Sequence, residues 1–258
     1  MNNYEIYNER MALGIEDKLF FLAEIGAYLH TVVDFGCADA TLGKALYRYN
    51  PDIQYIGIDN DEYMLESAEM NFPQGKYFLS LEDYLDNTIE HLYGEPFLKH
   101  TAIIFSSVLH EIFSYDYKIN WDNLAFFEYV VVRDMGLPQD SDYEKEVNFS
   151  YPLNNIIDYL DKHEVPISYY TNRYKFGDYY QLWLKYRYLE NWNTESLENY
   201  FACSQERIRE KLSEFFIPIH HRSFVHQYTK NTVIKTFGFD PFIIDTHYEL
   251  IAKNKIPF

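Results

Sequence analysis

The stretch TVVDFGCADATLGKAL, residues 31–46, decides the fold, because a strand, a tight turn and a helix follow one another in it. TVVDF is a short apolar run with β-branched residues, which is typical of a buried strand. ATLGKALYRYN has the pattern of a helix that Asn50-Pro51 ends. The turn between them, GCADA, contains a single glycine. The sequence therefore raises the question of why Ala38 and Ala40 stand where a cofactor-binding loop usually has glycine.

The rest of the N-terminal half repeats this alternation of apolar runs and helical patterns. Residues 9–29 carry apolar residues at helical spacing, and helices are also expected over 62–72, 81–94 and from 108 onward. Such an alternation predicts βαβ units and a parallel sheet with helices on both faces. The apolar runs that predict the further strands are QYIGID (54–59), GKYFLS (75–80), TAIIFSS (101–107) and FEYVVVRDM (127–135).

The alternation stops after the fifth strand. Residues 136–147 read as a polar loop, and residues 153–163 and 179–213 read as mainly helical. Two late strands are expected in FFIPIHHRSFV (215–225) and HYELIAKN (247–254). We therefore predict an α/β fold with a doubly wound, mostly parallel, seven-stranded Rossmann-like sheet and a mainly helical insertion after the fifth strand. The sheet domain would comprise residues 1–135 and 213–258, and residues 136–212 would form a substrate lid.

Composition restricts the classes of partner. The 258-residue chain has a net charge of −18, which repels phosphate backbones and anionic membranes. Its two cysteines allow no disulfide framework, which favours a reducing compartment. The N-terminal residues do not show the basic start and apolar run that are typical of a secretory signal. No apolar run in the sequence reaches the roughly 18 residues that a membrane span needs. We expect a cytoplasmic protein with no membrane contact.

The turn and the second strand together predict a site for an adenosine-type ligand. In open parallel sheets, ligands bind beyond the carboxyl ends of the strands, where the strand order reverses. Asp59 ends the second strand, where a carboxylate can accept hydrogen bonds from ribose hydroxyls. A pyrophosphate would be repelled by Asp39 in the turn, and the G-x-G-x-x-G and G-x-x-x-x-G-K-[ST] patterns are absent. S-adenosylmethionine has positive sulfonium and ammonium groups, so two nearby carboxylates, Asp34 and Asp39, favour it as the cofactor.

Several segments in order resemble the motifs of class I S-adenosylmethionine-dependent methyltransferases. VVDFGCADATLGKAL resembles their first motif, and YIGIDNDEYMLESAE resembles the segment with the ribose-binding acid. TAIIFSSVLHEI, EYVVVRDM and THYELIAKN resemble the fourth, fifth and closing strands. The resemblance covers about residues 20–135 and the last dozen residues. It implies a Rossmann-like methyltransferase fold with S-adenosylmethionine as the cofactor.

The same resemblance implies roles for individual residues. Ser106 takes the position in the fourth strand where the family often has Asp or Asn. Ala38 and Ala40 replace two later glycines of the family; if these positions need positive φ, alanine costs about 1 kcal/mol at each, and otherwise it fits. The cofactor-binding residues that the resemblance implies are Asp34, Gly36, Cys37, Asp39, Asp59, Asn60, Met64, Glu82, Asp83 and Ser106.

Candidate catalytic residues follow the fourth and fifth strands. His110-Glu111 could deprotonate a substrate oxygen or nitrogen during methyl transfer, or His110 could cap or pack the following helix. Arg133 could bind an anionic group of the substrate or form an ion pair with Asp134. No metal site is expected, because the adjacent residues His220 and His221 would point to opposite faces of a strand.

The identity of the acceptor stays open at this stage. Residues 168–188 have four basic residues and one acid among aromatic residues, and residues 205–235 have six Lys or Arg against three Glu. Such segments could bind RNA by stacking and phosphate pairing, or they could be a lid whose aromatic residues pack inward. We favour methyl transfer to an oxygen or nitrogen of a small molecule. The alternatives are an RNA or nucleotide methyltransferase and a non-catalytic binding or scaffold protein with a degraded loop. The oligomeric state is not predicted.

Overall fold

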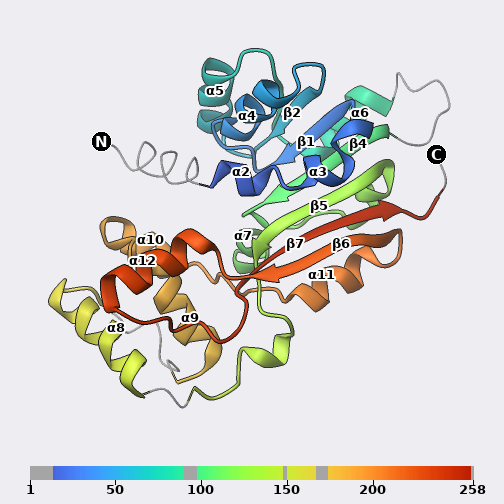
Figure 1. The fold of residues 1–258 in the computed structure, drawn as a ribbon. Helices are drawn as coiled ribbons and strands as arrows, with labels where there is room; N and C mark the ends of the chain where they lie inside the picture. Colours follow the sequence, from blue (N-terminus) through green and yellow to red (C-terminus); the bar gives the residue numbers. More distant parts are fainter. Residues whose placement is uncertain (1–13, 90–97, 148–149, 167–173, 257–258) are drawn as a thin grey trace.

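The computed structural model describes residues 14–89, 98–147, 150–166 and 174–256 (Figure 1). Its centre is a seven-stranded sheet with the order β3-β2-β1-β4-β5-β7-β6. The strands are β1 (Thr31–Phe35), β2 (Gln54–Ile58), β3 (Lys76–Phe78), β4 (Leu98–Ser106), β5 (Phe127–Met135), β6 (Phe216–Phe224) and β7 (His247–Asn254).

The sheet is mostly parallel, as predicted. The pairs β1–β2, β1–β4, β2–β3 and β4–β5 are parallel, whereas β7 runs antiparallel to both β5 and β6. The order of the strands reverses between β1 and β4, so the carboxyl ends of these two strands form the crevice in which such sheets bind ligands. The prediction of a doubly wound α/β fold is confirmed.

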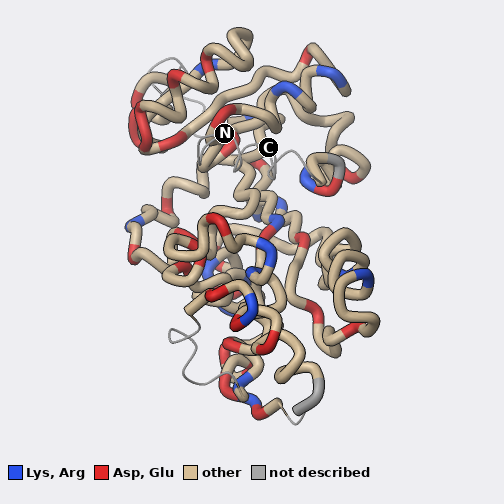
Figure 2. Tube along the Cα trace, turned by 90° about the vertical axis from the view of Figure 1, so that its left-hand side faces the viewer, with Lys and Arg blue, Asp and Glu red and all other residues tan. Residues whose placement is uncertain are grey.

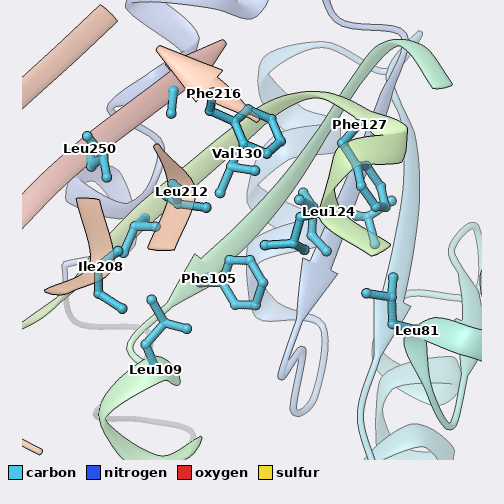
Figure 3. Packing of buried hydrophobic residues seen from close by; sticks show 14 of the residues in the cluster. Leu81, Phe105, Leu109, Leu124, Phe127, Val130, Ile208, Leu212, Phe216 and Leu250 are labelled. Carbon is cyan, nitrogen blue, oxygen red and sulfur yellow. The ribbon is translucent and has the colours of Figure 1, made fainter. Parts of the chain in front are cut away.

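Helices cover both faces of the sheet because side chains alternate along each buried strand. From β1, Val32 packs into the cluster under α2–α5, and Val33 packs into the cluster on the opposite face. On that opposite face, Phe105 and Val130 meet Ile208 of α11 (Figure 3). The helices of the first face are α2 (Ile15–Lys18), α3 (Phe21–Ile25), α4 (Thr41–Tyr49) and α5 (Glu62–Asn71), and those of the second are α6 (Leu81–Ile89), α7 (Leu109–Ser114) and α11 (Gln205–Leu212).

A second group of helices lies beyond the carboxyl end of β5 (Figure 1). It has its own apolar core, in which Tyr179, Tyr180 and Trp183 are fully buried. Val233 of α12 belongs to the same core, although α12 lies between β6 and β7 in the sequence. The pattern of late strands did not predict this helix. The group comprises α8 (Ser150–Lys162), α9 (Phe176–Lys185), α10 (Trp192–Glu195) and α12 (Gln227–Phe237), and we refer to it as the helical unit.

Short 3-10 helices join several of these elements: η1 (Gly26–Tyr28), η2 (Trp121–Phe126), η3 (Asp140–Asp142) and η4 (Leu189–Asn191). In the described part of the chain, no helix has the length and apolar character needed to cross a membrane. Within the described residues, the helices expected over 9–29 and 81–94 are α2, α3 and α6, and the remaining residues 9–13 and 90–94 lie outside the described ranges.

The basic residues of the helical unit do not form one continuous surface. Acidic and basic residues are interspersed along it (Figure 2). Lys185, expected among possible RNA contacts, is fully buried instead, and Lys175 forms a 3.8 Å ion pair with Glu146. Arg187 donates a 2.8 Å hydrogen bond to the hydroxyl of Tyr228. Helix packing thus turns part of the basic and aromatic side chains of 174–188 inward, whereas residues 168–173 lie outside the described residues. The structure gives no support for RNA recognition through 168–188 and 205–235.

Candidate functional site

The turn between β1 and α4 holds both alanines in the left-handed region of backbone conformation. Ala38 has φ 45° and Ala40 has φ 58°, and Gly36 has φ 75°. Each alanine is therefore strained by about 1 kcal/mol relative to glycine. At Gly36 the close approach of another element adds a second constraint, since a Cβ atom there would lie 2.6 Å from Cγ2 of Val108. The turn thus keeps the shape of a glycine loop with glycine only at its most crowded position.

Asp59 fastens this turn to the end of β2. Its Oδ2 atom accepts a 2.9 Å hydrogen bond from the backbone N–H of Ala38, and its Oδ1 atom accepts a 3.1 Å bond from that of Asp61. Burial raises the pKa of Asp59, and the two backbone donors oppose this shift. The remaining hydrogen-bonding capacity of the carboxylate faces a cavity, because Asp59 also lines the crevice at the carboxyl ends of the strands.

The cavity has a volume of about 660 Å³, which suits a molecule of the size of a nucleoside cofactor or a larger ligand. Its walls come from the β1–α4 turn, the ends of β2 and β4, the start of α6, helix α7 and the segment 191–198 of the helical unit. Seven residues expected from the sequence line it: Gly36, Asp59, Asn60, Met64, Glu82, Ser106 and Glu111.

Four residues expected at the cofactor do not line the cavity. Asp34 is buried and accepts a 2.6 Å hydrogen bond from the Tyr55 hydroxyl. Cys37 is also buried. Asp39 accepts hydrogen bonds from the backbone N–H and the hydroxyl of Thr41, at 3.1 and 2.7 Å, at the start of α4. Asp83 lies on the exposed side of α6. Asp34 and Asp39 thus support the turn and its surroundings without lining the cavity.

Ser106 places an unsatisfied polar atom at the cavity. The residue is 7% exposed, and its hydroxyl has no hydrogen-bond partner among the described residues. A buried hydroxyl without a partner costs free energy, so a ligand that hydrogen bonds to it would recover that cost. Ser106 ends β4 beside Arg133 of β5, which places it at the point where the strand order reverses.

His110 joins the sheet to the helical unit. Its Nδ1 atom lies 2.6 Å from Oδ1 of Asp134, and its Nε2 atom lies 2.8 Å from Oε1 of Glu198. Burial alone would lower the pKa of His110, but the two carboxylates outweigh it and raise the pKa well above the ordinary value. The ring is therefore an imidazolium ion held at both nitrogens, and neither nitrogen is free to take a proton from a substrate.

The other oxygen of Asp134 fixes the start of α7. Oδ2 accepts hydrogen bonds from the backbone N–H groups of Val108, Leu109 and His110, at 3.1, 2.6 and 3.4 Å. Asp134 is fully buried at the end of β5, so these bonds are shielded from water. One carboxylate thereby determines both where α7 begins and how the imidazole of His110 is oriented.

Glu111 follows His110 and faces the cavity. Burial raises the pKa of Glu111 to about 7, the imidazolium of His110 lowers it, and Glu198 and Asp134 raise it further. A carboxylate with a pKa near neutrality can accept a proton and release it again at physiological pH. One nitrogen or oxygen atom from each of His110, Glu111 and Glu198 lies within 4.8 Å of the others, a spacing that could also hold a metal ion.

Arg133 lies beside the cavity without lining it. Its Nη1 atom donates a 3.1 Å hydrogen bond to the hydroxyl of Ser107, which does line the cavity. Burial lowers the pKa of Arg133, and it also lowers the pKa of the neighbouring Lys18 of α2 to about 8. Arg133 thus supports the β4–α7 turn from one side of the sheet.

The sequence predicted a lid over residues 136–212, but it did not predict which residues of this segment line the cavity. Glu195 and Glu198 line the cavity, and Lys185 donates hydrogen bonds to the backbone carbonyls of both. Nothing in the spacing of residues 191–198 marks them as a site, because the contact forms only when the helical unit packs at the ends of β4 and β5. The further lining residues that sequence reasoning missed include Asp61, Tyr115, Tyr117, Lys118, Asn191 and Thr194.

Similarity to known proteins is found among solved structures. No known family model matches the sequence, and no curated protein matches it. Among solved structures, the chain is similar to the plantazolicin methyltransferase BamL in complex with a triazolic desmethylPZN analog and SAH, with a TM-score of 0.50 and 9% identity over 98% of this chain and 88% of that one. It is also similar to a SAM dependent methyltransferase from Archaeoglobus fulgidus, with a TM-score of 0.49 and 16% identity over 98% and 100% of the two chains.

At identities this low, the likeness concerns the fold. The strand order, the antiparallel β7 and the similarity to BamL together define the class I methyltransferase fold. The resemblance of the sequence motifs to this class is therefore confirmed at the level of the fold.

Proposed function

We propose that the protein is an S-adenosylmethionine-dependent methyltransferase that acts on a small molecule. One observation carries this proposal: Asp59, at the end of β2, lines a cavity of about 660 Å³ together with Gly36 and Ala38 of the β1–α4 turn. A ribose-binding carboxylate next to a closely approaching turn, at the point where strand order reverses, is the arrangement that an adenosine ligand needs.

The lining residues fit the parts of this cofactor. Asp59 would accept hydrogen bonds from the ribose hydroxyls, and Asn60 and Met64 would flank the adenine. Glu82 would lie near the adenine amino group, and the unsatisfied hydroxyl of Ser106 would bind a polar group of the cofactor. Asp34 and Asp39 would act through their charge and through the shape of the turn, since neither lines the cavity.

Bound S-adenosylmethionine supplies a methyl group on a positively charged sulfur, which is already an excellent leaving group. The residues of this chain then have to position the acceptor, exclude water and, where needed, remove a proton. We assign proton removal to Glu111, because its pKa is about 7 and it faces the cavity. His110 is a positioning residue that holds Glu198, since both of its nitrogens are engaged.

We also propose that the helical insertion, residues 136–212, closes the acceptor side of the cavity. It contributes Asn191, Thr194, Glu195 and Glu198 to the lining. Enclosure of the cavity by residues of the insertion would favour a small acceptor over an extended polymer. The net charge of −18 points the same way, because it repels the phosphates of a nucleic acid.

Calorimetric titration with S-adenosylmethionine and S-adenosylhomocysteine tests the proposal. We expect both to bind at micromolar levels, and we expect Asp59→Asn to weaken them at least tenfold through loss of charge-assisted hydrogen bonds. Asp52→Asn is the matched control, because Asp52 is exposed and outside the cavity. The absence of a heat change with either ligand, on protein with a native circular dichroism spectrum, would refute the proposal.

A further inference from the structure

The charged residues that line the cavity are very unequal in sign. Six are acidic and one is basic, namely Asp59, Asp61, Glu82, Glu111, Glu195, Glu198 and Lys118. Three of the acids, Glu111, Glu195 and Glu198, come from α7 and the helical unit, whereas the expected ribose ligand Asp59 directly follows β2. The acceptor side of the cavity therefore has its own set of carboxylates.

Glu198 is held at this wall from two directions. Its carboxylate lies 2.8 Å from the imidazolium of His110, and its backbone carbonyl accepts a hydrogen bond from the buried Lys185. The single positive charge of His110 is shared with Asp134, whose Oδ1 lies 2.6 Å from Nδ1. One imidazolium therefore faces two close carboxylates, and Glu111 adds a further acidic group beside them. The wall keeps an excess of negative charge.

Glu195 is fixed in a similar way. Its Oε2 atom accepts a 2.5 Å hydrogen bond from the hydroxyl of Tyr200, and its backbone carbonyl accepts one from Lys185. Carboxylates that are buried and oriented by other groups do not turn away into water, so the field that they produce inside the cavity is permanent.

Ser106, which we assign to the cofactor, indicates that the cavity holds a ligand, and two aromatic rings indicate the charge of the acceptor. The hydroxyl of Ser106, in a residue 7% exposed, lines the same cavity and has no hydrogen-bond partner in the described structure. Tyr115 and Tyr117 also line it, with ring centroids 6.0 Å apart. Tyrosine faces attract cations, so these rings suit a positively charged ligand rather than an anion.

We propose that the methyl acceptor is a small amine, bound as its ammonium ion by Glu111 and Glu198 and methylated on nitrogen. This inference rests on the proposed methyltransferase function. The ammonium ion gives one proton to the carboxylate of Glu111, which leaves a neutral amine. The nitrogen lone pair forms the new N–CH3 bond while the S–CH3 bond breaks. The electron pair of the broken S–CH3 bond stays on sulfur, and S-adenosylhomocysteine forms. The product is a methylated ammonium ion, and Glu111 later releases its proton to water.

The structure favours an amine over the other acceptor classes. A carboxylate or phosphate would be repelled by Glu111, Glu195 and Glu198, because like charges that meet in a desolvated site disfavour binding. A neutral hydroxyl would leave at least one buried carboxylate without compensation. A metal ion would have to displace His110 from its contact with Glu198, which the 2.8 Å distance shows to be already formed.

Matched ligands that differ in charge test the inference. The probes are phenethylamine, n-butylamine and spermidine, with phenylacetate, n-butyrate and 2-phenylethanol as the anionic and neutral counterparts. Each is titrated into wild-type protein saturated with S-adenosylhomocysteine, in buffer containing EDTA. We expect at least one amine to bind with a Kd below 1 mM and at least tenfold more tightly than its counterparts. Glu198→Gln should raise the Kd of that amine at least tenfold. Glu190→Gln, a change at an exposed residue nearby in the sequence, should leave the Kd unchanged.

Each other outcome overturns the inference, and the four below also identify the cause. If S-adenosylhomocysteine binds but no amine does, or if an anion binds more tightly, the amine assignment is wrong while the methyltransferase proposal stands. If S-adenosylhomocysteine itself does not bind, the proposed function has failed. If Glu198→Gln weakens S-adenosylmethionine much more than S-adenosylhomocysteine, the wall serves the cofactor's sulfonium. If Mn²⁺ binds to the wild type and not to His110→Ala, the wall is a metal site.

Discussion

The hydroxyl of Tyr55 lies 2.6 Å from Oδ2 of Asp34, inside the sheet and beneath the β1–α4 turn. Both residues are buried, and Asp34 pairs with Gly57 on β2 while Tyr55 pairs with Val32 on β1. Burial raises the pKa of Asp34 to about 6, and the hydrogen bond from Tyr55 and the charge of Lys18 oppose that shift. The acidic residue of the first motif is thus anchored within the sheet, from where it supports the turn.

Removing this hydrogen bond should destabilise the protein in a pH-dependent way. At pH 8, Tyr55→Phe leaves a buried carboxylate without its donor, and we expect it to lower the free energy of unfolding by roughly 2–3 kcal/mol. At pH 5, below the folded-state pKa of about 6, Asp34 is mostly protonated and the loss should be smaller. Without the hydrogen bond, the folded-state pKa of Asp34 rises above its value in the wild type. The stability that the variant loses at high pH is therefore recovered as the pH falls through this raised pKa.

Urea denaturation at pH 5 and pH 8 measures both values. Tyr77→Phe is the matched control, because its hydroxyl donates a 2.7 Å bond to the neutral backbone carbonyl of Phe72. Tyr77→Phe should lower the free energy of unfolding by about 1 kcal/mol at both pH values. Equal losses for Tyr55→Phe at both pH values would contradict an ionised Asp34 as the acceptor.

The turn allows a comparison between two alanines with the same backbone strain. Ala38 is half-buried and Ala40 is fully buried, and both have positive φ. Ala38→Gly should raise the free energy of unfolding by about 1 kcal/mol, because glycine adopts this conformation without strain. Ala40→Gly should change it little, because the loss of a buried methyl group, about 0.8 kcal/mol, offsets the relief.

The reverse change completes the test. Gly36→Ala should destabilise by more than 1 kcal/mol, since it combines positive φ with a Cβ position 2.6 Å from Val108. Thermal or urea unfolding of the three variants gives the order. A gain at Ala40 equal to that at Ala38 would show that the buried methyl group contributes nothing.

Sequence periodicity predicted the centre of the sheet because β1, β2, β4 and β5 are buried along most of their length and therefore read as continuous apolar runs. Helix α12 was missed because its apolar positions, such as Val233, are few and pack on a helical unit that is distant in the sequence. Its charged residues, read as a possible RNA contact, gave no sign of this packing. Helix packing between segments far apart in the chain has no local signature.

The site was predictable where strand ends determine it. Asp59 directly follows β2 and Ser106 is the last residue of β4, so the topology alone places them at the crevice. Asp34 was expected there on the same reasoning, but it lies one residue before the end of β1. Its side chain points, like that of Val32, to the face of the sheet that α2–α5 cover. Glu198 could not be predicted, since its place at the cavity depends on a contact with His110 that forms only in the folded chain.

The imidazolium of His110 should make stability depend on pH in a definite direction. It faces Asp134 of β5 and Glu198 of the helical unit, with Glu111 of α7 nearby. Its folded-state pKa is raised above the unfolded value of about 6.5, so the folded protein keeps a proton that the unfolded chain loses. The stabilisation is complete below pH 6.5 and disappears as the pH rises through the folded-state pKa.

We therefore expect His110→Gln to be roughly 3–5 kcal/mol less stable than the wild type at pH 6, as for other broken buried ion pairs. The difference should shrink as the pH is raised toward 9. His163→Gln, a change at an exposed histidine, serves as the control. Urea midpoints at pH 6, 7.5 and 9 test this, and a difference that grows with pH would show that His110 is neutral in the folded protein.

The last prediction concerns Lys185, which the sequence pattern grouped with surface cations. Its ammonium group is fully buried and donates hydrogen bonds to the side chain of Gln181 and to the backbone carbonyls of Glu195 and Glu198. Burial lowers the pKa of Lys185 to about 8. Lys185→Met keeps much of the volume but leaves buried carbonyls without this donor, and we expect it to lower the free energy of unfolding by roughly 2–4 kcal/mol.

Arg187→Met on the same segment removes a similar charge and should cost at most about 1 kcal/mol, because its bond to Tyr228 is exposed. Lys185→Met should also weaken the binding of any ligand that contacts Glu198, because Glu198 loses one of the two contacts that hold it. S-adenosylhomocysteine should bind as tightly as before. Urea denaturation and calorimetry on the two variants measure these effects. Equal stability of the two would show that Lys185 does not hold the segment 195–198, and the orientation of Glu198 would then depend on His110 alone.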